Sequence, residues 1–172
     1  MILGPKSIPA NKEVIEYLSW RATCVTDAQK KNLINKLGDA ICMKTGFVTY
    51  VGMTEKPQQK EDGKVVFPAG AKLVYYTLTD KEGREFIPLF TSEEELLKWT
   101  QAAERKPLRA ILTFDDLGPI FIANGKFFGA CINPMSDNFI MPRDLISSWT
   151  ARKNVMKDAA LRKAAQEAAE KG

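Results

Sequence analysis

Apolar and polar positions along this chain predict a succession of strands and helices, and one junction between the two is sharply marked. Residues 86–90 are all apolar, which predicts a strand that is covered on both faces. Ser92 and Glu95 follow at the spacing of a capping box, where a helix begins. Leu96 and Trp99 then recur at helical spacing, so we predict a helix of about a dozen residues with Trp99 on its buried face.

Pro88 conflicts with a central position for this strand, because proline has no N–H to donate to a sheet ladder. Either the strand is unpaired at that position or a β-bulge lies there. The next strand is predicted at residues 108–114. Strand, helix and strand then form a unit whose connection is expected to cross over right-handed within one sheet.

The N-terminal third is predicted to be helical in two pieces. Asn11 is placed to cap the first piece, and Thr26 with Gln29 has the capping-box spacing for the second. The second piece ends in a basic turn followed by Gly46, which is typical of a helix C-terminus. Neither piece would be stable alone, so we expect both to dock on a sheet.

β-Branched and aromatic content predicts further strands at residues 47–51, 64–67, 71–79, 127–132 and 139–141. The connections between the strands from residue 47 to residue 90 are short, which favours antiparallel pairing among them. Gly129 permits a neighbouring backbone to approach closely or a bulge to form. Asp115 and Asp116 are expected to cap a short helix that begins near Leu117.

The C-terminal segment is predicted to be one long helix. Pro142 suits its first position, and Ile146 and Trp149 give it an apolar face. Residues 151–170 contain seven alanines and no helix breaker. Because this far half is only weakly apolar, it does not require burial.

These segments predict an α+β fold, in which a mixed and mostly antiparallel sheet is packed by helices and a C-terminal helix extends from it. The length of 172 residues suits one domain with a small appendage. We expect residues 1–150 to form that domain, with residues 1–45 as its helical part. Residues 151–172 are expected to form a charged, alanine-rich helix attached to it.

Composition narrows the possible chemistry. The chain contains no histidine, which excludes Ser-His-Asp and Cys-His catalysis and any imidazole zinc site. Residues 151–172 carry six basic and three acidic groups, so much of the net charge of +4 lies there and the body is close to neutral. No apolar run approaches the roughly 20 residues that cross a bilayer, and we expect neither a membrane span nor a secretory signal.

Cysteine usage favours a cytoplasmic protein without disulfides. Cys24, Cys42 and Cys131 are odd in number and widely spaced, so reduced and buried thiols are expected. Cys131 beside Asn133 can be considered as a nucleophile, but its apolar strand favours a buried thiol that acts as a small hydrophobe.

Two motifs carry a resemblance to a known family: the run FIPLFTSEEELLKW at residues 86–99 and Ile132-Asn133-Pro134. With Asp115-Asp116-Leu117 between them, the chain resembles the amino-terminal domain of the SseB family over roughly residues 45–150. The resemblance implies a compact bacterial α+β domain, usually cytoplasmic, with no established enzymatic activity and no agreed catalytic residues.

Five residues are candidates for a ligand or partner site: Asn133, Pro134, Asp115, Asp116 and Tyr76. Asn133-Pro134 can shape a pocket at a strand end, or simply stop the strand. The aspartates can ligate a hard cation together with the glutamates at residues 93–95, or serve helix N-termini. Tyr76 can be an aromatic anchor; because adjacent strand residues point to opposite faces, either it or Tyr75 must face outward or meet another layer.

These observations lead to three functional hypotheses. The leading one is a non-enzymatic protein-binding or adaptor module, which binds another protein or pairs with itself through the C-terminal helix. The alternative is a small-ligand-binding protein or enzyme with a site near Asn133-Pro134. A further alternative is weak nucleic-acid binding through the basic tail. No catalytic residue, metal or cofactor is assigned.

Overall fold

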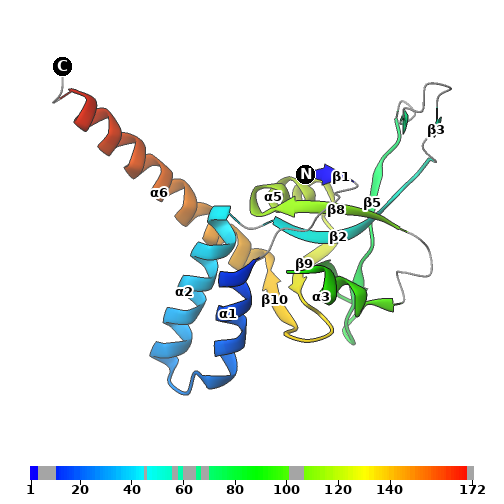
Figure 1. Cartoon of the computed structure of the whole chain (residues 1–172), viewed down its shortest axis with the longest axis horizontal. Coiled ribbons are helices and arrows are strands. Elements are labelled where there is room, and N and C mark those ends of the chain that lie inside the picture. Colours follow the sequence, from blue (N-terminus) through cyan, green and yellow to red (C-terminus); the bar gives the residue numbers. More distant parts are fainter. Residues whose placement is uncertain are drawn as a thin grey trace.

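The two N-terminal helices and the C-terminal helix gather at one end of the molecule, whereas the β-strands lie at the other end with two shorter helices among them (Figure 1). The fold is that of a computed structural model of the chain, which describes residues 1–3, 11–44, 46–55, 58–59, 65–66, 70–100 and 107–169. The α+β class expected from the sequence is confirmed.

The described helices range in length from 5 to 27 residues. They are α1 (Lys12–Trp20), α2 (Asp27–Lys44), α3 (Glu93–Leu97), α5 (Phe114–Ala123) and α6 (Arg143–Ala169), with a 3₁₀ turn at Arg21–Thr23. The capping box at the start of α2 is confirmed. The Thr26 N–H donates to Gln29 Oε1 at 2.9 Å, and the Gln29 N–H donates to Thr26 Oγ1 at 3.2 Å.

Asn11 directly precedes α1, but the prediction that its side chain caps this helix is wrong. The amide is 7 % exposed and donates instead to two carbonyl oxygens, those of Gly46 at 2.9 Å and Thr91 at 3.1 Å. A buried carbonyl without a hydrogen bond costs free energy, whereas the exposed N–H groups at the start of a helix can bond to water. The Asn11 amide therefore stabilises the fold more by pairing these carbonyls than by capping the helix. Asn11 therefore ties the helical end of the molecule to the strands.

The strands form two four-stranded sheets and one separate ribbon. Their bounds are β1 (Ile2–Leu3), β2 (Gly46–Met53), β3 (Gln58–Gln59), β4 (Val65–Val66), β5 (Leu73–Tyr75), β6 (Leu78–Thr79), β7 (Glu85–Leu89), β8 (Leu108–Thr113), β9 (Phe127–Ile132) and β10 (Phe139–Pro142). The first sheet has the order β1-β8-β2-β5, the second β10-β9-β7-β6, and β3 pairs with β4. Within the described residues, β7–β9 is the parallel ladder and the others are antiparallel.

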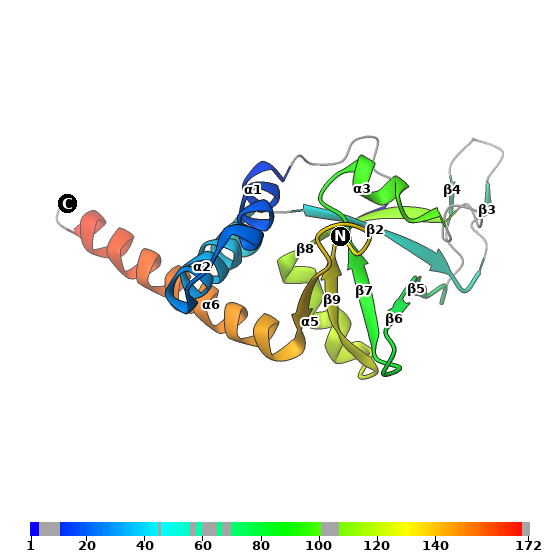
Figure 2. The ribbon, with the colours of Figure 1, turned by 90° about the horizontal axis from the view of Figure 1, so that it is seen from below.

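Within the described residues, one isolated β-bridge, between Val48 of β2 and Phe90 directly after β7, joins the backbones of the two sheets. The Val48 N–H donates to the Phe90 carbonyl at 3.0 Å, and the Phe90 N–H donates to the Val48 carbonyl at 2.8 Å. The mixed sheet expected from the sequence is therefore divided in two, with β2 and the end of β7 joining the halves (Figure 2).

The strand-to-helix junction is where the sequence places it, but the helix is shorter. Ser92 Oγ accepts the Glu95 N–H at 3.3 Å, as the capping-box spacing predicts. The prediction of about a dozen helical residues is wrong, because α3 ends at Leu97, and residues 101–106 lie outside the described part. Trp99 is 5 % exposed as expected, but it follows the helix.

Tertiary packing explains the short helix. The Trp99 N–H donates to the Leu96 carbonyl at 3.1 Å, which tightens the last turn. The indole then lies 5.8 Å from the Phe90 ring and 6.0 Å from the Tyr50 ring, centroid to centroid. This contact holds Trp99 in a second apolar cluster with Val48, Tyr50, Phe90 and Leu96.

The predicted right-handed strand–helix–strand unit is wrong. The strand after α3 is β8, which pairs antiparallel with β2 in the first sheet, whereas β7 belongs to the second sheet. The parallel partner of β7 is β9, reached only after β8 and α5. A short α3 cannot cover a crossover within one sheet.

Pro88 fits in β7 because β6, the neighbouring strand on one side, does not extend far enough to pair with it. On the other side it pairs with Cys131 of β9. The β6 ladder ends at Phe86, two residues earlier, and the Pro88 carbonyl accepts the Thr49 hydroxyl at 2.6 Å. The irregularity in the β7–β9 register lies at Glu85/Phe86 and not at the proline.

The strand predicted at residues 71–79 is broken into β5 and β6, which belong to different sheets. Tyr75 packs on Phe127 in the main core, and Tyr76 packs against the second cluster. The two tyrosines therefore meet two separate layers, which is one of the two arrangements that their alternation required.

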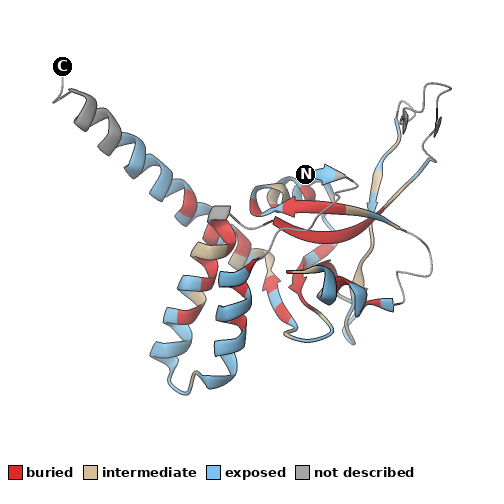
Figure 3. Cartoon of the chain, viewed as in Figure 1, coloured by how far each residue is buried: buried red, intermediate tan, exposed pale blue. Residues whose placement is uncertain are grey.

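The last helix, α6, is docked in its first half and projects in its second (Figure 1). Ile146, Trp149 and Lys153 are buried, as expected for the two apolar residues. From residue 154 to residue 162 every side chain is exposed (Figure 3). Among the described residues no helix is long and apolar enough to cross a membrane.

Candidate functional site

Asn133 is the centre of a buried hydrogen-bond network at the end of β9. It is 1 % exposed, with a positive φ of 46°. Its Oδ1 accepts the Thr91 N–H at 3.0 Å, and its Nδ2 donates to Thr91 Oγ1 at 2.8 Å and to Asp137 Oδ2 at 2.7 Å. Its own N–H donates to the Leu89 carbonyl at 2.9 Å. These contacts lock the β7–α3 junction to the β9–β10 turn and leave no amide group directed at a ligand.

Asp116 also has a structural position. Its Oδ2 accepts both the N–H and the hydroxyl of Thr113 at 2.8 Å, and its Oδ1 lies 3.0 Å from the amino group of Met1. Partial burial alone would raise the pKa of Asp116, but the hydrogen bonds from Thr113 and the Met1 ammonium hold that pKa below its ordinary value. The prediction that α5 begins near Leu117 is wrong: Thr113 is the N-cap, and the helix begins at Phe114.

Asp115 pairs with Lys153 of α6, with 2.7 Å between Oδ1 and Nζ. The glutamates at residues 93–95 lie elsewhere: Glu93 pairs with Arg109, and Glu95 with Lys98. Within the described residues no group of three or more acidic or cysteine side chains is placed to hold a metal ion.

Tyr76 is half-buried beside the second cluster, and its N–H donates to the Tyr50 carbonyl at 3.3 Å. The five candidate residues are thus distributed over three places: Asn133 and Pro134 after β9, the two aspartates on α5, and Tyr76 after β5. The fold does not bring them together into one site.

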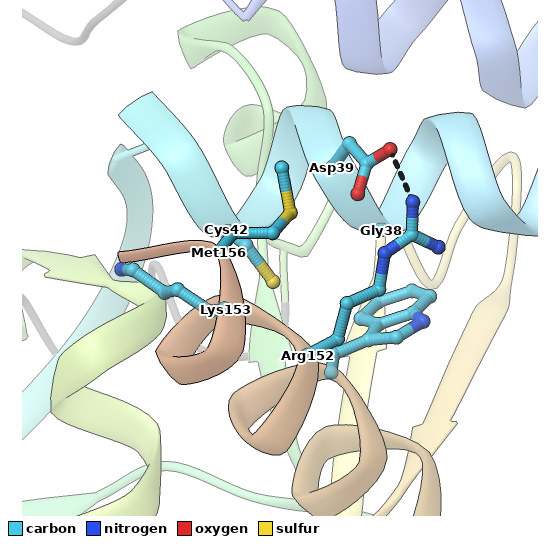
Figure 4. Close-up of a pocket in the computed structure, with 7 residues that line it drawn as sticks. Gly38, Asp39, Cys42, Arg152, Lys153 and Met156 are labelled. Carbon is cyan, nitrogen blue, oxygen red and sulfur yellow. Dashed lines mark hydrogen bonds and ion pairs between the residues drawn. The ribbon is translucent and has the colours of Figure 1, made fainter. Parts of the chain in front are cut away.

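At the junction of α2 with α6, charged and sulfur-containing side chains surround a very small cavity (Figure 4). The cavity there has a volume of about 10 Å³, barely that of one water molecule. Arg152 Nη2 lies 2.7 Å from Asp39 Oδ2, and Cys42 and Met156 line the same cavity. This arrangement fastens one helix to the other and has no room for a substrate.

Gly38 allows this junction to close. A Cβ at position 38 would lie 2.6 Å from Cε2 of Trp149, closer than side chains tolerate. Trp149 is 4 % exposed and packs directly on the backbone of α2 at this point. The first half of α6 is therefore held by an indole, the Arg152–Asp39 ion pair and the Lys153–Asp115 ion pair.

A larger depression lies between α5 and α6, which we call the α5–α6 groove. It has a volume of about 540 Å³ and a mainly apolar lining. Its walls include Phe121, Ile122, Ile146, Ser147, Thr150 and Ala151.

Ile122 stands at the rim of the groove and is 87 % exposed, the highest value among the large apolar side chains described. The cation at the end of the groove is occupied, because the Arg143 guanidinium donates to the carbonyls of Phe121, Asn124 and Phe127. The free lining is therefore apolar, hydroxyl and amide in character. It suits the side of a protein helix better than a charged small molecule.

Sequence reasoning missed this groove, although one signal pointed to it. The apolar residues of α5 extend round the whole helix, including Ile122, whereas a helix covering a core needs only one apolar face.

The α2 side of the α2–α6 junction and most of the groove lining belong to a segment that matches a known family. A model described as SseB protein N-terminal domain matches residues 26–147. The chain belongs to the SseB family. The match begins earlier than the resemblance expected from residue 45, so α2 is part of the SseB domain. It ends within the docked half of α6, before the projecting half begins. No curated protein and no solved structure matches the chain.

The thiols of this SseB-family protein differ in accessibility. Cys42 and Cys131 are buried and burial raises the pKa of each to about 11, whereas Cys24 is half-buried, so the expectation of three buried thiols is wrong at Cys24. We expect iodoacetamide at pH 8 to modify Cys24 in the folded protein and to reach Cys42 and Cys131 only on unfolding. Mass mapping of the alkylated peptides checks this, and rapid native labelling of Cys131 would contradict it.

The raised pKa values of Cys42 and Cys131 also predict how the stability of the fold depends on pH. The thiols of the unfolded chain ionise near pH 9, whereas the folded ones stay protonated to about pH 11. The unfolded state therefore binds fewer protons in this window, and stability contributed by the two thiols is present below pH 9 and falls as pH rises toward 11.

Proposed function

We propose that this SseB-family protein is a non-enzymatic protein-binding module that docks a helix of its partner in the α5–α6 groove. The observation that carries the proposal is the exposure of Ile122 beside an apolar groove of about 540 Å³. Covering an exposed apolar side chain together with the apolar groove beside it removes a continuous apolar surface from water, which is favourable. In this proposal residues 1–150 form the SseB-like domain, and residues 151–172 carry the helix that extends the docking surface.

The projecting half of α6 supports the same proposal. Val155 is 68 % exposed and Leu161 70 % exposed, both on a helix that leaves the body. Two of the tail's cations, Arg152 and Lys153, are engaged with Asp39 and Asp115, and Asp158 lies between Lys157 and Arg162. This leaves little uninterrupted positive charge for nucleic-acid phosphates, so protein binding is the better account of the helix.

The polar candidates are better explained by the fold than by a ligand site. Asn133 is buried with its amide occupied, and Asp115 and Asp116 hold α6 and the N-cap of α5. The described cysteines are free thiols, which supports a cytoplasmic place of action.

Site-specific photo-crosslinking tests the proposal. We expect a benzoylphenylalanine at position 122 to form discrete protein adducts in the cells that make this protein. The matched control is position 25, where Val25 is 83 % exposed in the turn before α2. A second variant, Ala151→Lys, places a charge in the groove and should abolish the adducts from position 122. Equal adducts from positions 122 and 25, or none from position 122, would overturn the proposal.

A further inference from the structure

The outer face of α6 carries a seam of exposed residues at alternating spacings of four and three. In order they are Asp144, Ser148, Ala151, Val155, Asp158 and Arg162. This spacing keeps the six residues on one side of the helix, as in a two-helix coiled coil. The side is opposite to Ile146, Trp149 and Lys153, which are buried in the body.

The charges of this seam have no partners among the residues that the structure describes. Over the described part of the chain, Asp144, Asp158 and Arg162 form no hydrogen bond or ion pair, whereas the adjacent Arg152 and Lys153 do. The seam also adjoins the α5–α6 groove, because Ala151 belongs to both.

We infer that the helix docked in the α5–α6 groove is α6 of a second copy of this chain, lying antiparallel about a twofold axis that passes the seam midway between Ala151 and Val155, at the level of Lys153. The inference rests on the proposed function and names the partner. Residues at equal distances on either side of Lys153 then face each other across the axis. Asp144 meets Arg162 of the second copy, and Ala151 meets Val155.

Charge complementarity selects this arrangement. Each antiparallel dimer contains two Asp144–Arg162 pairs, and Ser148 lies opposite Asp158, whose carboxylate accepts a hydroxyl hydrogen bond. A parallel pairing in the same seam would place Asp144 against Asp144 and Arg162 against Arg162, which is repulsive. The sequence of the seam is thus self-complementary in one direction only.

The projecting half of α6 acquires a position in this arrangement. It lies along the docked half of the other copy's helix, where Ile122 forms the wall of the groove. From Asp144 to Arg162 the helices overlap by five turns, or about 27 Å at 1.5 Å per residue. The contact is isologous, so it closes as a dimer and does not extend into a filament.

The test is a charge swap in the full chain, read by sedimentation equilibrium over a wide concentration range. The wild type should dimerise, more weakly as salt is raised. Asp144→Arg and Arg162→Asp each create two like-charge contacts per homodimer, and each should weaken dimerisation at least tenfold. Mixing the two variants in equal amounts restores both opposite-charge pairs, and a heterodimer of wild-type affinity is expected.

Lys157→Asp is the matched control, because it changes the charge of α6 by the same amount away from the seam and should leave dimerisation within twofold. Circular dichroism verifies that each variant is folded; if Asp144→Arg is not, Arg162→Asp on the projecting half still decides. A wild type that stays monomeric, or single variants that fail to pair on mixing, would overturn the second copy as partner. A photo-adduct from position 122 with a different protein would then leave the proposed function standing.

Discussion

Gly129→Ala is expected to lower the free energy of unfolding by about 3–5 kcal/mol, among the largest effects available to a single methyl group. A Cβ at position 129 would lie 2.2 Å from the carbonyl oxygen of Met141 and 2.9 Å from Cα of Pro142. Both are backbone atoms of β10, the strand paired with β9, so no rotamer change relieves the contact. The two strands must separate, and urea unfolding followed by fluorescence measures the loss.

Gly52→Ala is the matched control for this change. Gly52 also lies within a strand, but the nearest atom to its added Cβ is Cε2 of Tyr76 at 3.6 Å, an ordinary contact. We expect its effect to stay within about 1 kcal/mol, since alanine also reduces the freedom of the unfolded chain. Equal losses for the two variants would show that the close approach of β9 and β10 is not what requires glycine.

Asn133→Ala is expected to cost about 3–4 kcal/mol, because it leaves buried polar groups unpaired and places alanine at a positive φ. The Thr91 N–H loses its acceptor, and the Thr91 hydroxyl and the Asp137 carboxylate lose a donor. Asn133 joins β7, α3 and the β9–β10 turn, so the whole unfolding transition should shift in chemical denaturation.

Two variants separate the causes at Asn133. Asn133→Gly removes the amide but tolerates the φ of 46°, so its cost should be about 1 kcal/mol less than that of Asn133→Ala. Asn138→Ala changes the same residue type at the same φ of 46°, but on the surface, and should cost about 1 kcal/mol. If Asn138→Ala destabilised the protein as much as Asn133→Ala, the buried network would not be the cause.

Local signals in the sequence were read correctly where the structure depends on neighbours in the chain. The cap formed by Ser92 and the box of Thr26 with Gln29 both follow from contacts within four residues. The length of α3 did not follow, because the position of Trp99 is set by Tyr50, nearly 50 residues earlier, and by Phe90. The spacing of apolar residues within a helix does not indicate which distant residues will pack against it.

The division into two sheets was equally inaccessible to periodicity. Residues 71–79 were predicted to form one strand, yet the chain changes sheets after Tyr75. Tyr75 and Tyr76 were recognised as facing two sides, but not as belonging to two cores. Pairing partners are chosen by long-range packing, which strand propensity reports only weakly.

For the candidate site, the sequence directed attention to polar residues that turned out to be structural. Polar residues at strand ends and helix starts attract attention in a sequence, and Asn133, Asp115 and Asp116 were singled out for that reason. In the fold such residues satisfy exposed backbone groups and hold elements together. The α5–α6 groove is lined mainly by ordinary apolar and small residues that are distant in the sequence, so only the three-dimensional arrangement reveals it.

The parallel pairing of β7 with β9 has a consequence for how the chain acquires its shape. Leu89 is paired with Ile132, so 43 positions of chain must be enclosed before this ladder can form. Until residue 132 is synthesised, the apolar run from Phe86 to Phe90 lacks β9 as its pairing partner, and its apolar side chains remain exposed to solvent. The second sheet can therefore be completed only after residue 132 has been made, and we expect nascent chains interrupted between β7 and β9 to be prone to aggregate.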